Sequence, residues 1–383
     1  MIEEKKMLSI GKFKLKISIK MLMSFLPFLI LNYKLMADGL RQESMMFIDA
    51  KVLCCVCTIA LAYINGFRRT AQREYLYFDC VMLILCVIVA LRRDSFWIQD
   101  FCMILALANV VRFNFDQFSA FVWTSVAAII PFFLRWLLAM IRVGGYLGNR
   151  GPIHFTTVII LVVAWMYIER IKPMWQYIGL IVAATLDFLG NSRTYLIVCA
   201  IAFLLVTYYN FAGKLTPKKL AIAFLGIVAA SMVAIKLQDK FVKLFTNKWS
   251  GQTTIFTGRS MMWIDVLSEF KWLGYPENYI QNTYLLGNVH NGFIQSYVSY
   301  GAVFAVMYIL LILLTIAKCI KNRKNITIQG FTIVFIPVTV AAFFESNFIL
   351  ETEYLYLGVC NAVLIGQIFR KAGDIMERKN VTR

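Results

Sequence analysis

Long apolar runs recur along most of the chain, and they constrain its fold more than any other feature. A membrane-crossing helix needs about 20 predominantly apolar residues. Candidate spans lie near 17–36, 46–66, 75–91, 96–111, 117–141, 154–168, 175–190, 194–211, 219–235, 291–317, 328–344 and 354–369. The pattern predicts an all-α polytopic membrane protein with about 12 transmembrane helices.

Composition supports a lipid environment for most of the chain. Of its 383 residues, 60% are hydrophobic and 16% are charged, and the mean hydropathy is +0.69. A soluble domain typically carries roughly 25% charged residues. The net charge of +18 would suggest nucleic acid in a soluble protein, but the basic residues lie between apolar runs. There they set topology and contact anionic lipid headgroups, so we expect no nucleic-acid partner.

Lys and Arg are distributed unequally between the two sides of the predicted membrane bundle. Most of them lie on the side that holds both chain ends, which makes this side cytoplasmic. The longest segment between spans, 236–289, then faces outward. We therefore expect a bundle over 1–235, an outward-facing loop over 236–289 with amphipathic helices, and a bundle with a cytoplasmic tail over 290–383.

Arginine dominates the short segments that are predicted to face outward. They contain Arg41, Arg92, Arg93, Arg142, Arg150 and Arg193. A planar guanidinium holds two phosphate oxygens at once, so this bias suits an anionic ligand at the outer surface. Arginines also extend from helix ends toward the membrane interface, and that simpler interpretation stays open.

The predicted outer loop carries two amphipathic segments. Residues 236–248 place apolar side chains at helical spacing between lysines, a pattern typical of a helix on a membrane surface. After Arg259, helical spacing recurs in Met262, Trp263, Val266, Leu267 and Phe270. Gly274 ends this second helix. His290 and Asn291 then stand at the outer end of the next span.

These outer residues carry a family resemblance. Gly258-Arg259, Trp263 and Gly274, followed by His290-Asn291 and Gly301, resemble the signature of the O-antigen ligase and Wzy-type O-antigen polymerase family. Asn191-Ser192-Arg193-Thr194, at the outer end of a span, is similar to the Ser-Arg motif of that family. Phe304 departs from the family's ligases, which often have a small or hydroxyl residue there.

The resemblance implies an inverting glycosyltransferase with a GT-C-like fold in the bacterial cytoplasmic membrane. Its donor would be an oligosaccharide on undecaprenyl pyrophosphate, and its reaction would need no cofactor, metal or nucleotide sugar. We favour a polymerase that joins repeat units into O-antigen, capsule or exopolysaccharide. A ligase that transfers finished glycan to another acceptor and a flippase for lipid-linked oligosaccharides remain the alternatives. A chain-length regulator and a separate flippase would be partners of a polymerase.

The proposed chemistry gives roles to a small set of side chains. His290 suits a general base because imidazole titrates near neutral pH, and Arg259 suits stabilisation of the leaving group. The predicted pyrophosphate contacts are Arg193, Arg259, Arg142 and Arg93, and the predicted glycan contacts are Asn291, Trp263 and Tyr284. His154 is a second candidate base. Alternatively, His290 caps the helix that follows it.

Arg135 lies deep in an apolar run, where an unpaired charge costs several kcal/mol. Asp187 and Glu345 both lie near the outer ends of predicted spans. Either carboxylate could therefore pair with Arg135, and a structural ion pair is favoured over a substrate contact.

Overall fold

The computed structural model places about half of the chain. It describes residues 6–10, 13–17, 84, 87–88, 118–143, 150–190, 192–211, 259–276, 279–284, 289–345 and 364–369. The chain divides into two compact units, Met1–Leu147 with Val306–Phe335 and Leu350–Arg383, and Gly148–Ala305 with Ile336–Ile349. The domain boundaries at 235 and 289 stay predictions.

Several sequence predictions fall on residues outside the described ones. These are the spans near 46–66, 96–111 and 219–235, nearly all of those near 17–36 and 75–91, and the amphipathic segment 236–248. The count of about 12 spans therefore stays a prediction.

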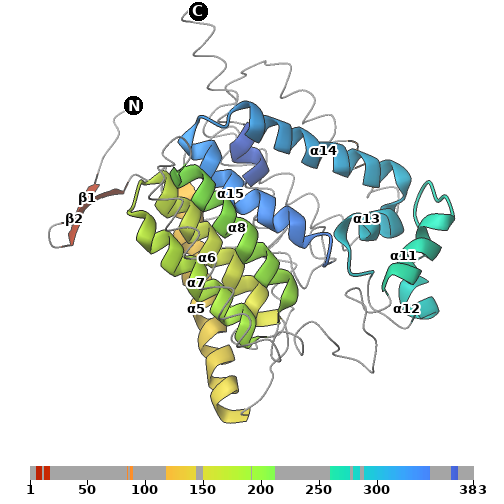
Figure 1. Cartoon of the computed structure of the whole chain (residues 1–383), viewed down its shortest axis with the longest axis horizontal. Coiled ribbons are helices and arrows are strands. Elements are labelled where there is room, and N and C mark those ends of the chain that lie inside the picture. The colour runs from red at the N-terminus through yellow and green to blue at the C-terminus, as the bar shows by residue number, and fades with distance from the viewer. Residues whose placement is uncertain are drawn as a thin grey trace, which may run out of the picture. The chain divides into compact units, whose positions relative to one another are not determined.

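Most described residues are helical, in agreement with the predicted class. The helices are α5 (Phe118–Val143), α6 (Arg150–Ile168), α7 (Pro173–Leu189), α8 (Arg193–Phe211), α11 (Arg259–Ser268), α12 (Tyr279–Tyr284), α13 (Gly292–Tyr300), α14 (Ala302–Lys321) and α15 (Ile326–Ala341) (Figure 1). Two strands, β1 (Lys6–Ile10) and β2 (Phe13–Ile17), pair antiparallel with Leu8 opposite Leu15. The sequence analysis did not predict this hairpin, although lysines and apolar residues alternate in β2 with the period of a strand.

Among the described residues, two helices are long and apolar enough to cross a membrane. They are Thr194–Phe211, within α8, and Ala302–Lys321, which is α14. Shorter apolar helices cover Phe155–Ile168, Pro173–Leu189 and Ile326–Ala341. Large apolar side chains point outward from these helices, including Ile181 on α7 and Leu204 on α8, 60% and 67% exposed. Lipid is the solvent that such surfaces suit.

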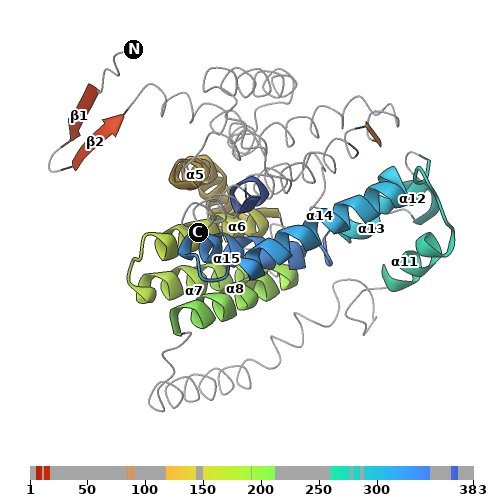
Figure 2. The same ribbon diagram turned by 90° about the horizontal axis from the view of Figure 1, so that it is seen from above.

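Helices α6, α7 and α8 lie side by side, as both ribbon views show (Figures 1 and 2). Their shared interior holds the carboxylate of Asp187, which is fully buried. It accepts hydrogen bonds from Thr156 Oγ1 at 2.7 Å and from Cys199 Sγ at 3.3 Å. Asp187 thereby links all three helices. Its predicted pairing with Arg135 is not tested, because the Arg135 side chain lies outside the described ones.

The apolar run 291–317 forms two helices instead of the single predicted span. Helix α13 ends before Gly301. The φ of Gly301 is +90°, a backbone conformation that residues with a side chain rarely adopt. A Cβ at Gly301 would overlap the carbonyl oxygen of Trp272. The N–H of Ala302 donates to the carbonyl of Lys271 at 3.0 Å, so the chain after α11 is held against the first residue of α14.

A small apolar core holds α11, α12 and α13 together. Its buried members are Met262, Val266, Tyr275, Ile280, Val289, Tyr297, Val298 and Ala305. The apolar stripe predicted for the helix after Arg259, which is α11, is only partly buried. Leu267 is 56% exposed, and Phe270 lies beyond the helix, which ends at Ser268.

Candidate functional site

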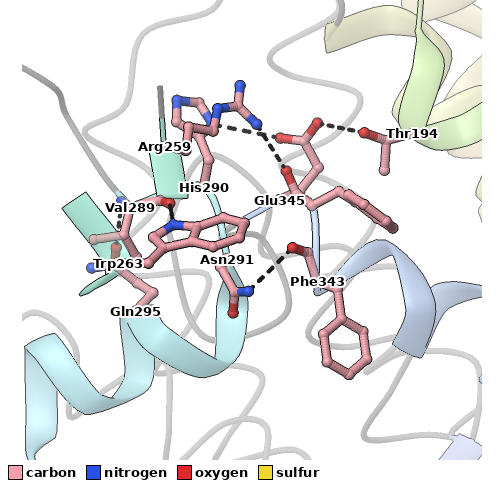
Figure 3. A network of polar contacts seen from close by, with 10 residues as sticks. Thr194, Arg259, Trp263, Val289, His290, Asn291, Gln295, Phe343 and Glu345 are labelled. Carbon is pink, nitrogen blue, oxygen red and sulfur yellow. Dashed lines mark hydrogen bonds and ion pairs between the residues drawn. The ribbon is translucent and has the colours of Figure 1, made fainter. Parts of the chain in front are cut away.

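Four of the predicted site residues come together at the end of α15. Arg259 begins α11, Trp263 lies one turn later, and His290 and Asn291 directly precede α13. Figure 3 shows their side chains around residues 343–345, which follow α15. Residues far apart in the chain therefore form one polar cluster.

Three successive main-chain carbonyls, those of residues 342–344, organise this cluster. They accept hydrogen bonds in chain order from the N–H of Gly292 at 2.6 Å, from Nδ2 of Asn291 at 3.2 Å and from Nη1 of Arg259 at 3.2 Å. All three residues lie in the turn that follows α15, and their carbonyl oxygens accept from N–H donors of a backbone, an amide and a guanidinium. This turn thereby fixes the segments at Arg259 and at Asn291.

The backbone at His290 is unusual, with φ of +50°. Such a left-handed conformation is uncommon for a residue with a side chain. The next residue, Asn291, caps α13, because its Oδ1 accepts from the N–H groups of Phe293 and Ile294, both at 3.0 Å. The alternative that His290 caps this helix is therefore wrong. Asn291 does so and is 6% exposed, and its contact with a glycan stays a prediction.

The imidazole of His290 faces the carboxylate of Glu345. Nδ1 of His290 lies 3.8 Å from Oε2 of Glu345, while Oε1 accepts a hydrogen bond from Thr194 Oγ1 at 3.1 Å. The two side chains are 31% and 22% exposed, so both reach solvent. A carboxylate in this position can orient the imidazole and stabilise its protonated form. The sequence analysis offered Glu345 only as one of two possible partners of Arg135 and missed this pairing.

Trp263 fixes the chain immediately before His290. Its Nε1 donates to the carbonyl of Val289 at 2.7 Å, and the N–H of Val289 donates to Oε1 of Gln295 at 3.1 Å. Val289 itself is fully buried in the apolar core that α11, α12 and α13 share. Both sides of this peptide segment are held, which restricts where the imidazole can point.

The segment 192–194 approaches the same carboxylate from α8. Ser192 donates its N–H to the carbonyl of Asp187 at 2.8 Å, and Thr194 reaches Glu345. Arg193 is the first residue of α8, and its side chain lies outside the described ones. The structure therefore places the backbone of Arg193 next to a site residue, and its contact with pyrophosphate stays a prediction.

Of the remaining predicted residues, the structure describes the side chain of Tyr284, which bonds away from this cluster. The hydroxyl of Tyr284, on α12, donates to Oδ2 of Asp265, on α11, at 3.3 Å. Desolvation, with the negative charge of Asp265, raises the pKa of Tyr284 to about 12. Arg93 lies outside the described residues, and so do the side chains of Arg142 and His154.

The described cluster offers an imidazole, a carboxylate and a guanidinium within one site. Among the described residues, no group of three or more His, Cys, Asp or Glu side chains could hold a metal ion. No protein-family model and no curated protein matches the chain. What the site can do chemically is therefore argued from its geometry.

Proposed function

We propose that the chain is an inverting membrane glycosyltransferase that joins undecaprenyl-pyrophosphate-linked oligosaccharides into surface polysaccharide. It works on the outer face of the bacterial cytoplasmic membrane, through which the chain passes several times with both ends cytoplasmic. The observation that carries the proposal is the junction of Arg259, His290 and Glu345, next to apolar helices of membrane-crossing length. The resemblance in sequence supports the same reaction.

His290 is the base in this proposal. It takes the proton of an acceptor sugar hydroxyl, whose oxygen forms a bond to the anomeric carbon of the donor. The bond from that carbon to the pyrophosphate oxygen breaks, and lipid pyrophosphate leaves with the electron pair. Attack from the opposite face inverts the anomeric configuration. Glu345 stabilises the imidazolium from the side of Nδ1, which is itself buried, and the exposed part of the ring passes the proton to water.

Arg259 stabilises the departing pyrophosphate. Its guanidinium presents five N–H donors in a planar fork that matches phosphate oxygens. The contact with the Phe344 carbonyl holds this fork beside Glu345 before any substrate binds. Preorganised donors of this kind stabilise developing negative charge without rearrangement during the reaction. Arg193 would supply a second guanidinium from the start of α8.

The remaining cluster residues hold these groups in place. Asn291 and Gly292 tie the His290 segment to the end of α15, and Trp263 ties it to α11. We propose that the edge of Trp263 also borders the acceptor glycan. Tyr284 contacts a more distant sugar of the same chain, because its hydroxyl bonds to Asp265 and not to a residue of the cluster.

Reconstitution tests the proposed reaction directly. The purified chain receives undecaprenyl-pyrophosphate-linked repeat units in detergent, without nucleotide or metal, and glycan length and released carrier lipid are measured. We expect longer glycans with equimolar release of undecaprenyl pyrophosphate. His290→Gln should abolish most of this release, whereas Asn282→Ala, an exposed change on α12, should not. Lipid movement across liposomes with unchanged glycan length would instead identify a flippase.

The same assay distinguishes a polymerase from a ligase. A polymerase lengthens glycan when repeat units are the only sugar substrate, because one unit is the donor and another the acceptor. A ligase releases carrier lipid only when a second lipid or wall-polymer acceptor is added. Release that depends strictly on such an acceptor would reject the polymerase assignment while keeping the chemistry.

A further inference from the structure

One side of α11 and the turn after it exposes large apolar side chains to the surroundings. We call this the α11 apolar surface. It consists of Met261, Ile264, Leu267, Phe270, Trp272 and Leu273, which are 55% to 74% exposed. An exposed apolar cluster of this density on a short segment commonly marks an interaction site. The proposed reaction uses none of these side chains.

The opposite side of α11 is anchored, so the apolar surface cannot turn inward. Met262 and Val266 are buried in the core shared with α12 and α13. The hydroxyl of Tyr275 donates to the carbonyl of Val266 at 2.7 Å. Desolvation raises the pKa of Tyr275 to about 12, and its phenol therefore keeps this proton at neutral pH.

The turn 270–273 is fixed against the start of a candidate membrane-crossing helix. The Lys271 carbonyl accepts from the N–H of Ala302, the first residue of α14. Gly301 lies so close to Trp272 that no side chain would fit between them. The next residue, Val303, is an exposed apolar side chain of α14. The turn therefore lies beside the first residues of α14, where this helix would enter the membrane.

The side chains of this turn are of the types that membrane interfaces favour. The rings of Phe270 and Trp272 meet edge to face with centroids 4.8 Å apart. Lys271 lies between them in the sequence and pairs with Glu269 at 2.9 Å, and the two side chains are 41% and 62% exposed. Aromatic rings with a neighbouring cation are enriched at headgroup level, where the rings meet acyl chains and the charge meets phosphates.

We propose that the α11 apolar surface inserts into the interface of the lipid bilayer that α14 crosses. The occupant is lipid because the surface is fixed at the entry point of an apolar helix. Arg259 and Trp263 lie on the same short helix, so insertion holds them at headgroup depth, where phosphates of a membrane-anchored molecule lie. The inference rests on α14 crossing the membrane and not on the proposed glycosyl transfer.

Site-directed spin labelling of the full chain tests this insertion. In a variant whose nine native cysteines are replaced, single nitroxides are placed at Ile264, Leu267 and Phe270, and the control label is placed at Asn282 on α12. The protein is reconstituted into vesicles of phosphatidylethanolamine and phosphatidylglycerol. Collision rates with oxygen, which concentrates in lipid, and with a water-soluble nickel chelate are then measured.

We expect oxygen to reach the three labels on the apolar surface more readily than nickel, and the reverse at Asn282. Nickel access equal to that at Asn282 would place the surface in water and overturn the proposal. Protection from both reagents would show protein contact, from a second copy or a partner, and would equally reject lipid.

A second measurement keeps all native cysteines and needs no substitution. A photoreactive phospholipid in the same vesicles should label peptides within 259–276, identified by mass spectrometry, but not the peptide that carries Asn282. Absence of label from 259–276, with label present on α14, would contradict insertion. Neither measurement reads activity, so failure of the glycosyltransferase proposal cannot be mistaken for failure of this one.

Discussion

Nδ1 of His290 lies 3.8 Å from Oε2 of Glu345, and the other oxygen of that carboxylate accepts from Thr194. This arrangement joins the segment before α13, the end of α15 and the start of α8. The carboxylate thus faces the imidazole that the proposed reaction uses as its base.

The first prediction concerns Glu345. Glu345→Gln removes the negative charge but keeps an oxygen that can accept from Thr194, so the fold should be retained. Turnover should fall by roughly 10-fold or more, because general acid–base catalysis typically contributes about 10²–10⁴-fold and the imidazolium would lose its counter-charge. Release of carrier lipid under saturating donor measures the effect. Glu269→Gln, at an exposed carboxylate paired with Lys271, is the matched control and should retain full turnover.

The second prediction concerns His290 itself. His290→Ala and His290→Gln should both lower turnover by about 10²-fold or more, because neither residue can take a proton at neutral pH. Binding of the donor lipid should change little, because a base contacts the acceptor hydroxyl and not the donor phosphates. Full turnover in His290→Gln, at normal expression, would reduce His290 to a structural residue and leave the base unassigned.

The third prediction separates charge from shape at Arg259. Arg259→Lys keeps the positive charge but loses the planar fork and the reach to the Phe344 carbonyl. We expect a loss in turnover on the order of 10², the effect typical of one lost transition-state donor. Arg193→Lys should behave alike if both guanidinium groups hold the same pyrophosphate. Arg323→Lys, at an exposed turn after α14, serves as the control. Unchanged kinetics in Arg259→Lys would exclude a bidentate phosphate contact.

The fourth prediction concerns stability at the α13–α14 junction. Gly301→Ala places a Cβ in the left-handed region and against the carbonyl of Trp272. Such backbone strain costs about 1–3 kcal/mol before the overlap is counted, so thermal unfolding in detergent should begin at a clearly lower temperature. Val303→Ala, an exposed change two residues later, should leave the transition near that of the native chain. An unchanged unfolding temperature in Gly301→Ala would show that the backbone between α13 and α14 can shift to accommodate a side chain.

Apolar run length predicted much of the described fold. The spans expected at 154–168, 175–190 and 194–211 correspond to α6, α7 and α8, which begin and end within a few residues of those limits. This works because membrane-crossing helices need long uninterrupted apolar segments. The same rule failed at Gly301, where the run stays apolar on both sides of the break. The cause is a backbone contact with Trp272, which composition cannot reveal.

The candidate site was predicted in part. Arg259, Trp263, His290 and Asn291 were singled out by the resemblance to a family signature and by the chemistry of a guanidinium and an imidazole. Their contacts with residues 342–345 depend on tertiary folding across segments distant in the chain. Glu345 was visible as a carboxylate at a span end, but no spacing rule connects it to His290. Long-range pairing of that kind needs a structure.

The three carbonyls at the end of α15 have a consequence for how this site can vary between species. Residues 342–344 hold Arg259, Asn291 and Gly292 through main-chain carbonyls. These three contacts therefore do not depend on which side chains residues 342–344 carry. Arg259 keeps its partner whichever side chain residue 344 carries, whereas Ala342 is buried and Phe343 packs against Phe293. Proline is the exception, because its restricted φ would alter the turn that aims the carbonyls. This half of the site is therefore specified more by its backbone path than by the side chains along it.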